Sequence, residues 1–381
     1  MNKKRWMSVL LGTVLLAAGC AGEPAETGST PLAFQTGKTA EQILLEAPKE
    51  LKVHQGERYR ISIDGPVNVP DLEKVYAVTT EINPWVNQEL PTVFFDGAFE
   101  CDNRKPETTT QIDGYLEQNL GFADKKGNEL NVSTYGFLTY QTEVGKLQNE
   151  FVNLAASEQW GSALIPLDEQ KELSFATQQE AKELVKEKLK AMGLPEINYI
   201  KVGSMSCERL NRLYPENKAT IDSHNAFLKE MGKDVADVEH VWTEDEEFYM
   251  LQGYFDYQGM TCTEWSYTHQ VKEESMEPSS FIAYVNKDGL QWLDIDAAYM
   301  EKSAVEITKI LSLEEAVEKL DEYCSKIIGI EFDSSQVNFR YVPVPISNTV
   351  LGRELRPCWC FDYREYYGGY AVDAETGEIY G

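Results

Sequence analysis

Two segments carry apolar residues at three- and four-residue spacing, the pattern of an amphipathic helix. Each begins with a capping box, in which a hydroxyl accepts from the amide three residues on and a glutamate reaches back. The two boxes are Thr177-Gln178-Gln179-Glu180 and Ser312-Leu313-Glu314-Glu315. The apolar faces behind them are Leu184, Val185, Leu189 and Met192 in the first segment, and Val317, Leu320, Cys324, Ile327 and Ile328 in the second. Both segments therefore predict helices that pack on another layer.

Segments with strand-like alternation follow each predicted helix in the same order. The matching pairs are 197–202 with 337–342, Tyr254-Phe255-Asp256-Tyr257 with Cys360-Phe361-Asp362-Tyr363, and 283–289 with 370–377. The last pair runs into turns that contain glycine. The first copy carries extra residues between Gly203 and about Val241. The order helix, strand, strand, hairpin occurs twice, which predicts two related units over residues 174–305 and 306–381, each an antiparallel sheet covered by one helix.

Residues 47–173 have a different pattern. Short β-branched and aromatic runs predict strands near 59–63, 75–79 and 135–140, with turns at Asp64-Gly65-Pro66 and Lys126-Gly127-Asn128. We therefore expect a separate β-rich N-terminal domain there. The predicted fold class is α+β, with this β-rich region followed by the two helix-plus-antiparallel-sheet units.

The N-terminus has the pattern of an export signal. Lys3, Lys4 and Arg5 precede an apolar run over residues 6–18, which is shorter than the roughly 20 residues that span a bilayer. The run ends in Leu16-Ala17-Ala18-Gly19-Cys20, which resembles the bacterial lipoprotein signal, although Ala17 stands where leucine is commoner. The resemblance implies cleavage between Gly19 and Cys20, which leaves a diacylated Cys20 at the mature N-terminus. An ordinary signal peptide with a chance Cys20 is the alternative. Residues 21–46 then predict a flexible tether that begins with a small, polar stretch.

The charge balance narrows the classes of partner. The chain has 35 Lys and Arg against 63 Asp and Glu, a net charge of −28, and a pI near 4.5. Nucleic-acid binding depends on clustered basic residues, so no nucleic-acid partner is expected. Anionic lipids and polymers are repelled as well.

No established catalytic motif stands out. The four histidines, His54, His224, His240 and His269, show no spacing that would place two zinc ligands on one helix face. Nucleophile elbows and phosphate-binding glycine loops are also missing from the sequence. We therefore expect no enzyme, no cofactor and no metal site. Catalysis by dispersed carboxylates stays open as an alternative, because sequence does not tell which acids lie together.

Six cysteines remain once Cys20 is lipidated, and an exported location permits disulfides. Six thiols allow 15 complete pairings. Cys207 with Cys262 lies within the first unit, and Cys324 with Cys358 or Cys360 would tie the second helix to its sheet. Burial of Cys324 as a small core residue is the alternative that its helical position favours. Cys358 and Cys360 share one strand face, so a soft-metal or redox role is a further alternative. Cys101 is the sixth cysteine.

Two further clusters have an ordinary structural explanation. Aromatic residues crowd between Trp359 and Tyr370, where they could stack on sugars or hold a peptide, but a half-buried sheet has the same pattern. The acidic run Glu244-Asp245-Glu246-Glu247 lacks the ligand spacing and glycine of a calcium loop, so a solvated run is favoured.

Two families resemble parts of the chain. Residues 53–70 with ISIDGPVNVPD, the acidic stretch before Gly253, and residues 283–290 together resemble a Gram-positive lipoprotein family known only as a domain of unknown function. Residues 312–316 and 359–381, with Asp373-Ala374-Glu375-Thr376-Gly377, are similar to PepSY-type units and to extracytoplasmic proteins that restrain a sensor kinase. Those kinase regulators are typically anchored by a helix. Neither resemblance implies a catalytic residue.

Together these patterns predict a lipoprotein anchored through Cys20 to the outer face of a Gram-positive membrane. We expect a non-enzymatic binding or regulatory module of the cell envelope, with an envelope protein as its partner. A carrier or receptor for a small ligand or wall fragment is the first alternative, and a hydrolase with dispersed carboxylates is the second.

Overall fold

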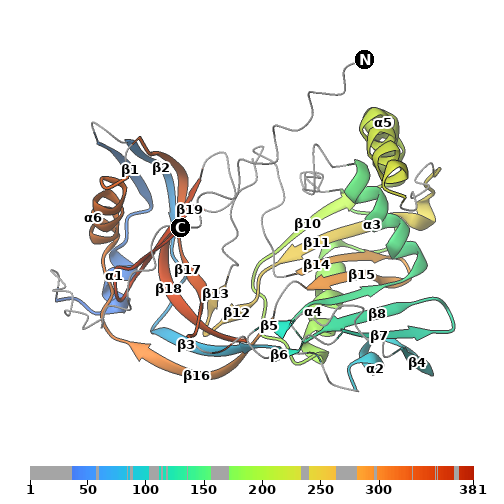
Figure 1. Ribbon diagram of the computed structural model, residues 1–381, viewed down its shortest axis with the longest axis horizontal. Coiled ribbons are helices and arrows are strands. Elements are labelled where there is room, and N and C mark those ends of the chain that lie inside the picture. Colours follow the sequence, from blue (N-terminus) through green and yellow to red (C-terminus); the bar gives the residue numbers. More distant parts are fainter. Residues whose placement is uncertain are drawn as a thin grey trace, which may run out of the picture. The chain divides into compact units, whose positions relative to one another are not determined.

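The computed structural model describes residues 37–381 except 57–59, 84, 86–88, 103–110, 113–114, 117–118, 135, 156–170, 233–239, 263–280, 296–297, 328, 348, 350 and 364–368. Residues 37–381 belong to one compact unit. Within it, most strands belong to two eight-stranded sheets, here named sheet A and sheet B (Figure 1). The structure confirms an α+β protein with a β-rich N-terminal region and two related helix-plus-sheet units.

Sheet A combines strands from both ends of the chain. Its main order is β1-β2-β17-β18-β19-β20, and β3 pairs with both β18 and β16. The β2–β17 pair is parallel and the others are antiparallel. The strands are β1 (Glu50–Gln55), β2 (Arg60–Asn68), β3 (Val75–Ile82), β16 (Tyr299–Ile307), β17 (Glu331–Pro345), β18 (Gly352–Tyr363), β19 (Gly369–Asp373) and β20 (Ile379–Tyr380).

Sheet B is entirely antiparallel and has the order β10-β11-β14-β15-β9-β8-β7-β4. Its strands are β4 (Phe99–Asp102), β7 (Asn119–Asp124), β8 (Glu129–Ser133), β9 (Leu138–Gln141), β10 (Ile200–Met205), β11 (Phe248–Gly253), β14 (Phe281–Asn286) and β15 (Gly289–Ile295). Two hairpins lie outside the large sheets: β5 (Gln111–Ile112) with β6 (Tyr115–Leu116), and β12 (Asp256–Tyr257) with β13 (Met260–Thr261).

The helices cover the sheets. They are α1 (Ala40–Glu46), α2 (Pro91–Phe94), α3 (Glu143–Ala155), α4 (Gln178–Ala191), α5 (Cys207–Glu230) and α6 (Leu313–Cys324), with a short 3₁₀ turn at Glu244–Glu246. Helix α6 packs on β19 and β20, and α4 packs on β10, β11 and β15. Both expected capping boxes are present at Thr177 and Ser312.

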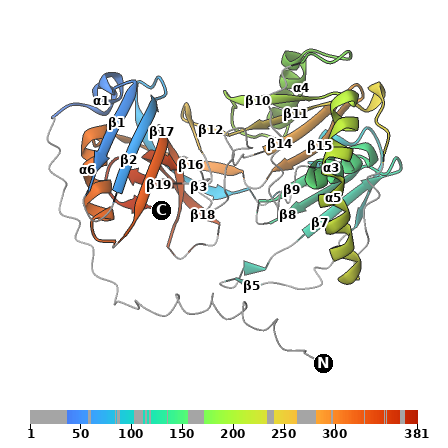
Figure 2. The same ribbon diagram turned by 90° about the horizontal axis from the view of Figure 1, so that it is seen from above.

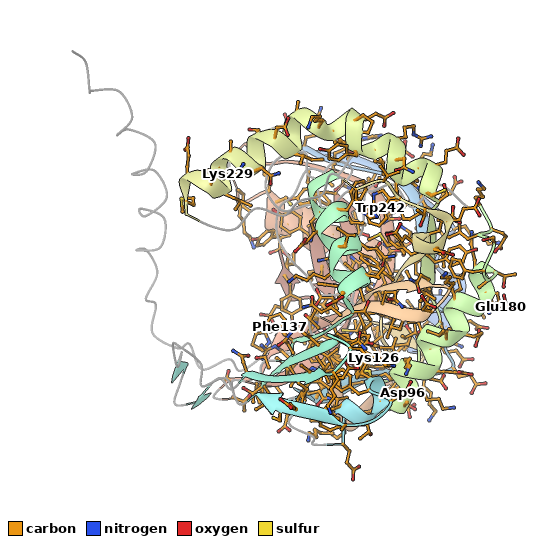
Figure 3. All side chains as sticks on the ribbon, turned by 90° about the vertical axis from the view of Figure 1, so that its right-hand side faces the viewer. Asp96, Lys126, Phe137, Glu180, Lys229 and Trp242 are labelled. Carbon is orange, nitrogen blue, oxygen red and sulfur yellow. The ribbon has the colours of Figure 1, made fainter. Side chains whose placement is uncertain are left out.

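Helices cover both faces of sheet B, and neighbouring side chains of β11 show this because they contact different helices. The Tyr249 hydroxyl accepts from Leu173 N–H and donates to the Ala176 carbonyl, just before α4. The next residue, Met250, belongs to a core with Phe151 of α3, Leu210 of α5 and Trp242. Successive strand side chains point to opposite faces, so α4 covers one face and α3 with α5 the other (Figure 2). In Figure 3, Trp242 lies close to α3 and α5, and Glu180 lies on α4.

The two predicted repeats share their topology. In the first, α4 precedes the antiparallel order β10-β11-β14-β15, and in the second α6 precedes β17-β18-β19-β20. Their echoed tetrapeptides do not occupy the same place, however. Residues 360–363 lie inside β18, whereas Tyr254 and Phe255 follow the end of β11 and Asp256 begins β12. The extra residues of the first copy form α5, a helix that the sequence pattern did not indicate.

Three expectations about the N-terminal region need correction. The last part of the flexible tether expected over residues 21–46 is helical, since α1 begins at a capping box on Thr39 and buries Ala40, Ile43 and Leu44. Strands of residues 47–173 do not form a sheet of their own, because β1–β3 join sheet A and β4 with β7–β9 join sheet B. The turn expected at Asp64-Gly65-Pro66 is strand instead, inside β2. A Cβ on Gly65 would lie 1.7 Å from the Ser335 carbonyl oxygen, so this glycine permits close approach of β17 rather than a change of direction. The turn expected at 126–128 does connect β7 and β8.

Candidate functional site: an acidic cleft beside the β12–β13 hairpin

A cleft of about 480 Å³ lies beside the β12–β13 hairpin. Its walls come from the loop after α4, from the hairpin, from the start of β16 and from Asn83 after β3. Three lining residues are acidic, namely Glu196, Asp256 and Glu301, and no lysine, arginine or histidine lines it among the residues that the structure describes. The volume falls in the range of about 300–1,000 Å³ that is typical of small-molecule sites.

Asp256 is the buried carboxylate of the cleft, with 7% of its surface exposed. One carboxylate oxygen accepts from Asn198 N–H at 2.7 Å, and the other accepts from the Thr261 hydroxyl at 2.8 Å. Burial raises the pKa of Asp256 above its ordinary value of 3.8, and Glu196 adds to the rise, while the bonds from Thr261 and Asn198 lower it. The carboxylate is thus held in place by neutral donors.

The hairpin that carries Asp256 is fixed by its turn and by one tyrosine. Gln258 and Gly259 connect β12 to β13 and both have positive φ, at 49° and 80°, as a two-residue type I′ turn requires. Tyr257 O–H donates to the Tyr299 carbonyl at 3.0 Å, and Tyr299 N–H donates back to the Tyr257 hydroxyl at 2.9 Å. This reciprocal pair joins the hairpin to β16.

The other two carboxylates lie at the edge of the cleft and are exposed. Glu301 accepts from the side-chain amide of Gln258 at 2.7 Å. The Glu196 carbonyl accepts from Asp256 N–H at 2.9 Å, so the loop after α4 is bonded to the hairpin through its backbone. Chemically, the cleft offers oxygen acceptors and negative charge on a rigid frame. The carboxylate-dependent hydrolase stays a hypothesis.

Cys20, the expected lipidation site, lies outside the described residues. In the structure, Cys207, Cys324, Cys358 and Cys360 are free thiols. Cys324 is fully buried in α6, as its place on the apolar face indicated, and burial raises its pKa to about 11. Burial also raises the pKa of Cys358 well above its usual range and that of Cys360 to about 12, so neither thiol is poised to form a reactive thiolate.

Three further cysteines and two rings of the aromatic cluster lie in the protein interior, whereas one cysteine is exposed. Cys358 and Cys360 pack with Val342 and Ala371 in one apolar cluster. Cys262 is buried and its backbone bridges to Tyr341 of β17, while Cys101 is exposed on β4. Trp359 and Phe361 have no exposed surface, and the Trp359 ring lies 4.8 Å from that of Phe339. Stacking on a sugar is therefore excluded for these two rings.

The acidic run at 244–247 is bonded to the protein rather than simply solvated. Glu246 accepts from Thr243 and lies 2.7 Å from His240, and Asp245 pairs with Lys287 at 2.6 Å. Glu247 is buried and accepts from Cys207 N–H in the first turn of α5. No cluster of three metal-ligating side chains occurs in the described part of the chain.

The other histidines are scattered. His54 is exposed on β1. His224 lies on α5, but the structure does not describe its side chain, and His269 lies outside the described residues. Sequence reasoning missed the cleft itself. Asp256 was singled out in a repeat echo, but nothing in the pattern connected it with Glu196 and Glu301.

Comparisons with known proteins bear on the fold alone. No protein-family model matches the chain, and no curated protein matches it. Among solved structures, the chain is similar to an uncharacterized protein from Eubacterium rectale ATCC 33656, with 15% sequence identity and a TM-score of 0.54. The match covers 90% of this chain and 97% of that one. Among the described residues, no helix has both the length and the apolar character needed to cross a bilayer.

Proposed function

We propose that this protein is a lipoprotein held by Cys20 on the outer face of the cell membrane, where it acts as a non-enzymatic binding or regulatory module. The observation that carries this proposal is the N-terminal order of three basic residues, a short apolar run and Leu16-Ala17-Ala18-Gly19-Cys20.

The anchor is tested by comparing the native chain with Cys20→Ser. We expect the native protein in the membrane fraction, with an N-terminal peptide that begins at a diacylated Cys20, and the variant in the soluble or culture fraction. Cys101→Ser is the matched control, because it removes an exposed thiol far along the chain and should leave membrane association unchanged. An unmodified Cys20 in the native protein would overturn the anchor.

A regulatory role predicts a protein partner in the envelope. Crosslinking in intact cells, followed by mass spectrometry, should enrich one membrane protein with the native chain and lose it with Cys20→Ser. Enrichment that persists in the released variant would mean that anchoring does not position the partner.

Binding of a small ligand or wall fragment is the second candidate function, and the cleft at Asp256 favours it. The cleft has the volume of a ligand site, polar groups that converge from four segments, and one buried carboxylate with a raised pKa. Titration of the protein with soluble wall fragments tests this second function. It predicts saturable binding that a substitution in the cleft, such as Glu301→Gln, weakens.

A further inference from the structure

We propose that the cleft binds a primary ammonium group, carried by a small ligand or by a lysine-like side chain of a peptide. This inference rests on the proposed binding function and names the chemical class of the ligand. The walls of the cleft carry negative charge. Glu196, Asp256 and Glu301 come from three different segments, and the lining contains no basic residue among the described positions.

Asp362 in the second repeat offers a contrast within the same chain, because it is also a buried aspartate but has a cationic partner. Asp362, in the tetrapeptide that echoes Asp256, pairs with Arg340 at 2.6 Å. Its other oxygen accepts from the side-chain amides of Gln336 and Asn338, at 3.0 and 2.5 Å. A cation from the chain itself therefore balances this charge.

Asp256 has the neutral donors but not the cation. Its partners are Asn198 N–H and the Thr261 hydroxyl, and no lysine or arginine of the described chain pairs with it. Asp256 also borders open space, since it lines the cleft. A ligand's ammonium would supply at Asp256 the charge that Arg340 supplies at Asp362.

The rest of the cleft suits an ammonium as well. An ammonium donates three hydrogen bonds and accepts none, and the exposed Glu196 and Glu301 add acceptors around the entrance. Residues 256–259 are held by the turn and by the Tyr257–Tyr299 pair, so little ordering is required on binding. The net charge of −28 favours approach of a cation and opposes that of an anion.

The test is calorimetric titration of the full chain in neutral detergent with two probes. One is a tripeptide amide with an acetylated N-terminus and a central lysine, and the other is the same peptide acetylated on the lysine side chain. We expect the lysine peptide to bind at least about tenfold more tightly, because acetylation removes the charge. Added salt should weaken its binding.

Variants locate the site. Glu196→Gln and Glu301→Gln should each weaken the lysine peptide about threefold, in the range of an exposed charge pair. Glu318→Gln, which removes an exposed carboxylate on α6 outside the cleft, should leave affinity unchanged. Equal binding of both probes, or equal loss with Glu318→Gln, overturns the inference.

A parallel titration with soluble wall fragments separates this inference from the proposed function. Saturable binding of fragments without binding of the lysine peptide would overturn the ammonium assignment and leave the binding function standing. Failure of every probe and fragment would overturn both the ammonium assignment and the ligand-binding candidate, and would leave the anchor to be judged by Cys20→Ser.

Discussion

The two repeats share a chain order but treat buried charge in opposite ways. In the second unit, acidic side chains are balanced by arginines of the same sheet. Asp362 pairs with Arg340, and Asp373 pairs with Arg356 at 2.7 Å. In the first unit, Asp256 is held only by neutral donors. The difference separates a unit in which two buried aspartates pair with arginines from one in which a buried carboxylate borders a cleft.

The arginine pairs of the second unit also fix its turns. One Asp373 carboxylate oxygen accepts from the backbone N–H groups of Glu375 and Thr376, at 2.8 and 2.9 Å, and Arg356 donates to both carboxylate oxygens, at 2.7 and 3.2 Å. The hairpin motif at 373–377 is therefore a structural clamp that connects β19, its turn and β18. A bidentate contact of this kind gives geometric specificity.

The largest expected effect is at this clamp. Asp373→Ala removes a carboxylate with no exposed surface and leaves Arg356, only 8% exposed, with its partners Glu354 and Glu375 alone. Breaking a buried pair from one side typically costs about 3–5 kcal/mol. Urea unfolding followed by tryptophan fluorescence should show this loss. Asp373→Asn, which keeps an acceptor for the turn amides, should lose less. A loss below about 1 kcal/mol for the alanine variant would mean that the pair is not a clamp.

Arg340→Met should have a smaller effect. Asp362 would lose its cation but keep the amides of Gln336 and Asn338, so we expect a loss of about 2 kcal/mol rather than the full cost of an unpaired buried charge. The same urea titration measures it. If the variant is as stable as the native chain, then neutral donors suffice for Asp362 and the contrast with Asp256 disappears.

The helix caps should behave alike in the two units. Thr177 and Ser312 make the same pair of bonds with Glu180 and Glu315, so Thr177→Ala and Ser312→Ala should each cost about 1 kcal/mol. Losses in the double variant should add, since the two boxes share no partner. Thr177→Ser is the control that keeps the cap. A much larger loss at one box would show that the two helices do not serve equivalent roles.

Local signals made these caps predictable from sequence, and the helix-plus-sheet order with them. A capping box lies within four residues, and strand alternation within six, so each is visible without knowledge of the rest of the chain. The burial of Cys324 followed in the same way from its helical spacing. In contrast, α5 was missed because Pro215 interrupts a segment whose start at Ser206 is its main local signal.

Long-range pairing was not predictable. Strand β2 lies beside β17 through contacts such as Arg60 with Glu331, and nothing near either residue indicates a partner some 270 positions away. The same limit hid the cleft, whose three carboxylates belong to segments that meet only in the folded chain. Even Gly65, a strong turn signal by composition, is explained by the neighbouring Ser335 carbonyl.

The smallest expected effect tests the comparison at Asp256 itself. A carboxyl group whose folded pKa lies above its unfolded value favours the folded state when it is protonated. Its contribution is therefore complete below about pH 3.8 and is lost as the pH rises through the raised folded pKa. Asp256→Asn should thus be slightly more stable than the native chain at pH 7, by about 1 kcal/mol or less, and this gain should shrink on acidification.

Urea midpoints at several pH values between neutrality and pH 4 check the sign. Glu318→Gln, the exposed control on α6, should show no such change of its difference from the native chain. If Asp256→Asn is instead less stable at pH 7, with a gap that closes in acid, then the bonds from Asn198 and Thr261 outweigh the burial of the charge. In that case neutral donors alone would stabilise the charge of Asp256, whereas Asp362 has an arginine partner. The inference that a ligand's ammonium binds in the cleft would then lose its main support.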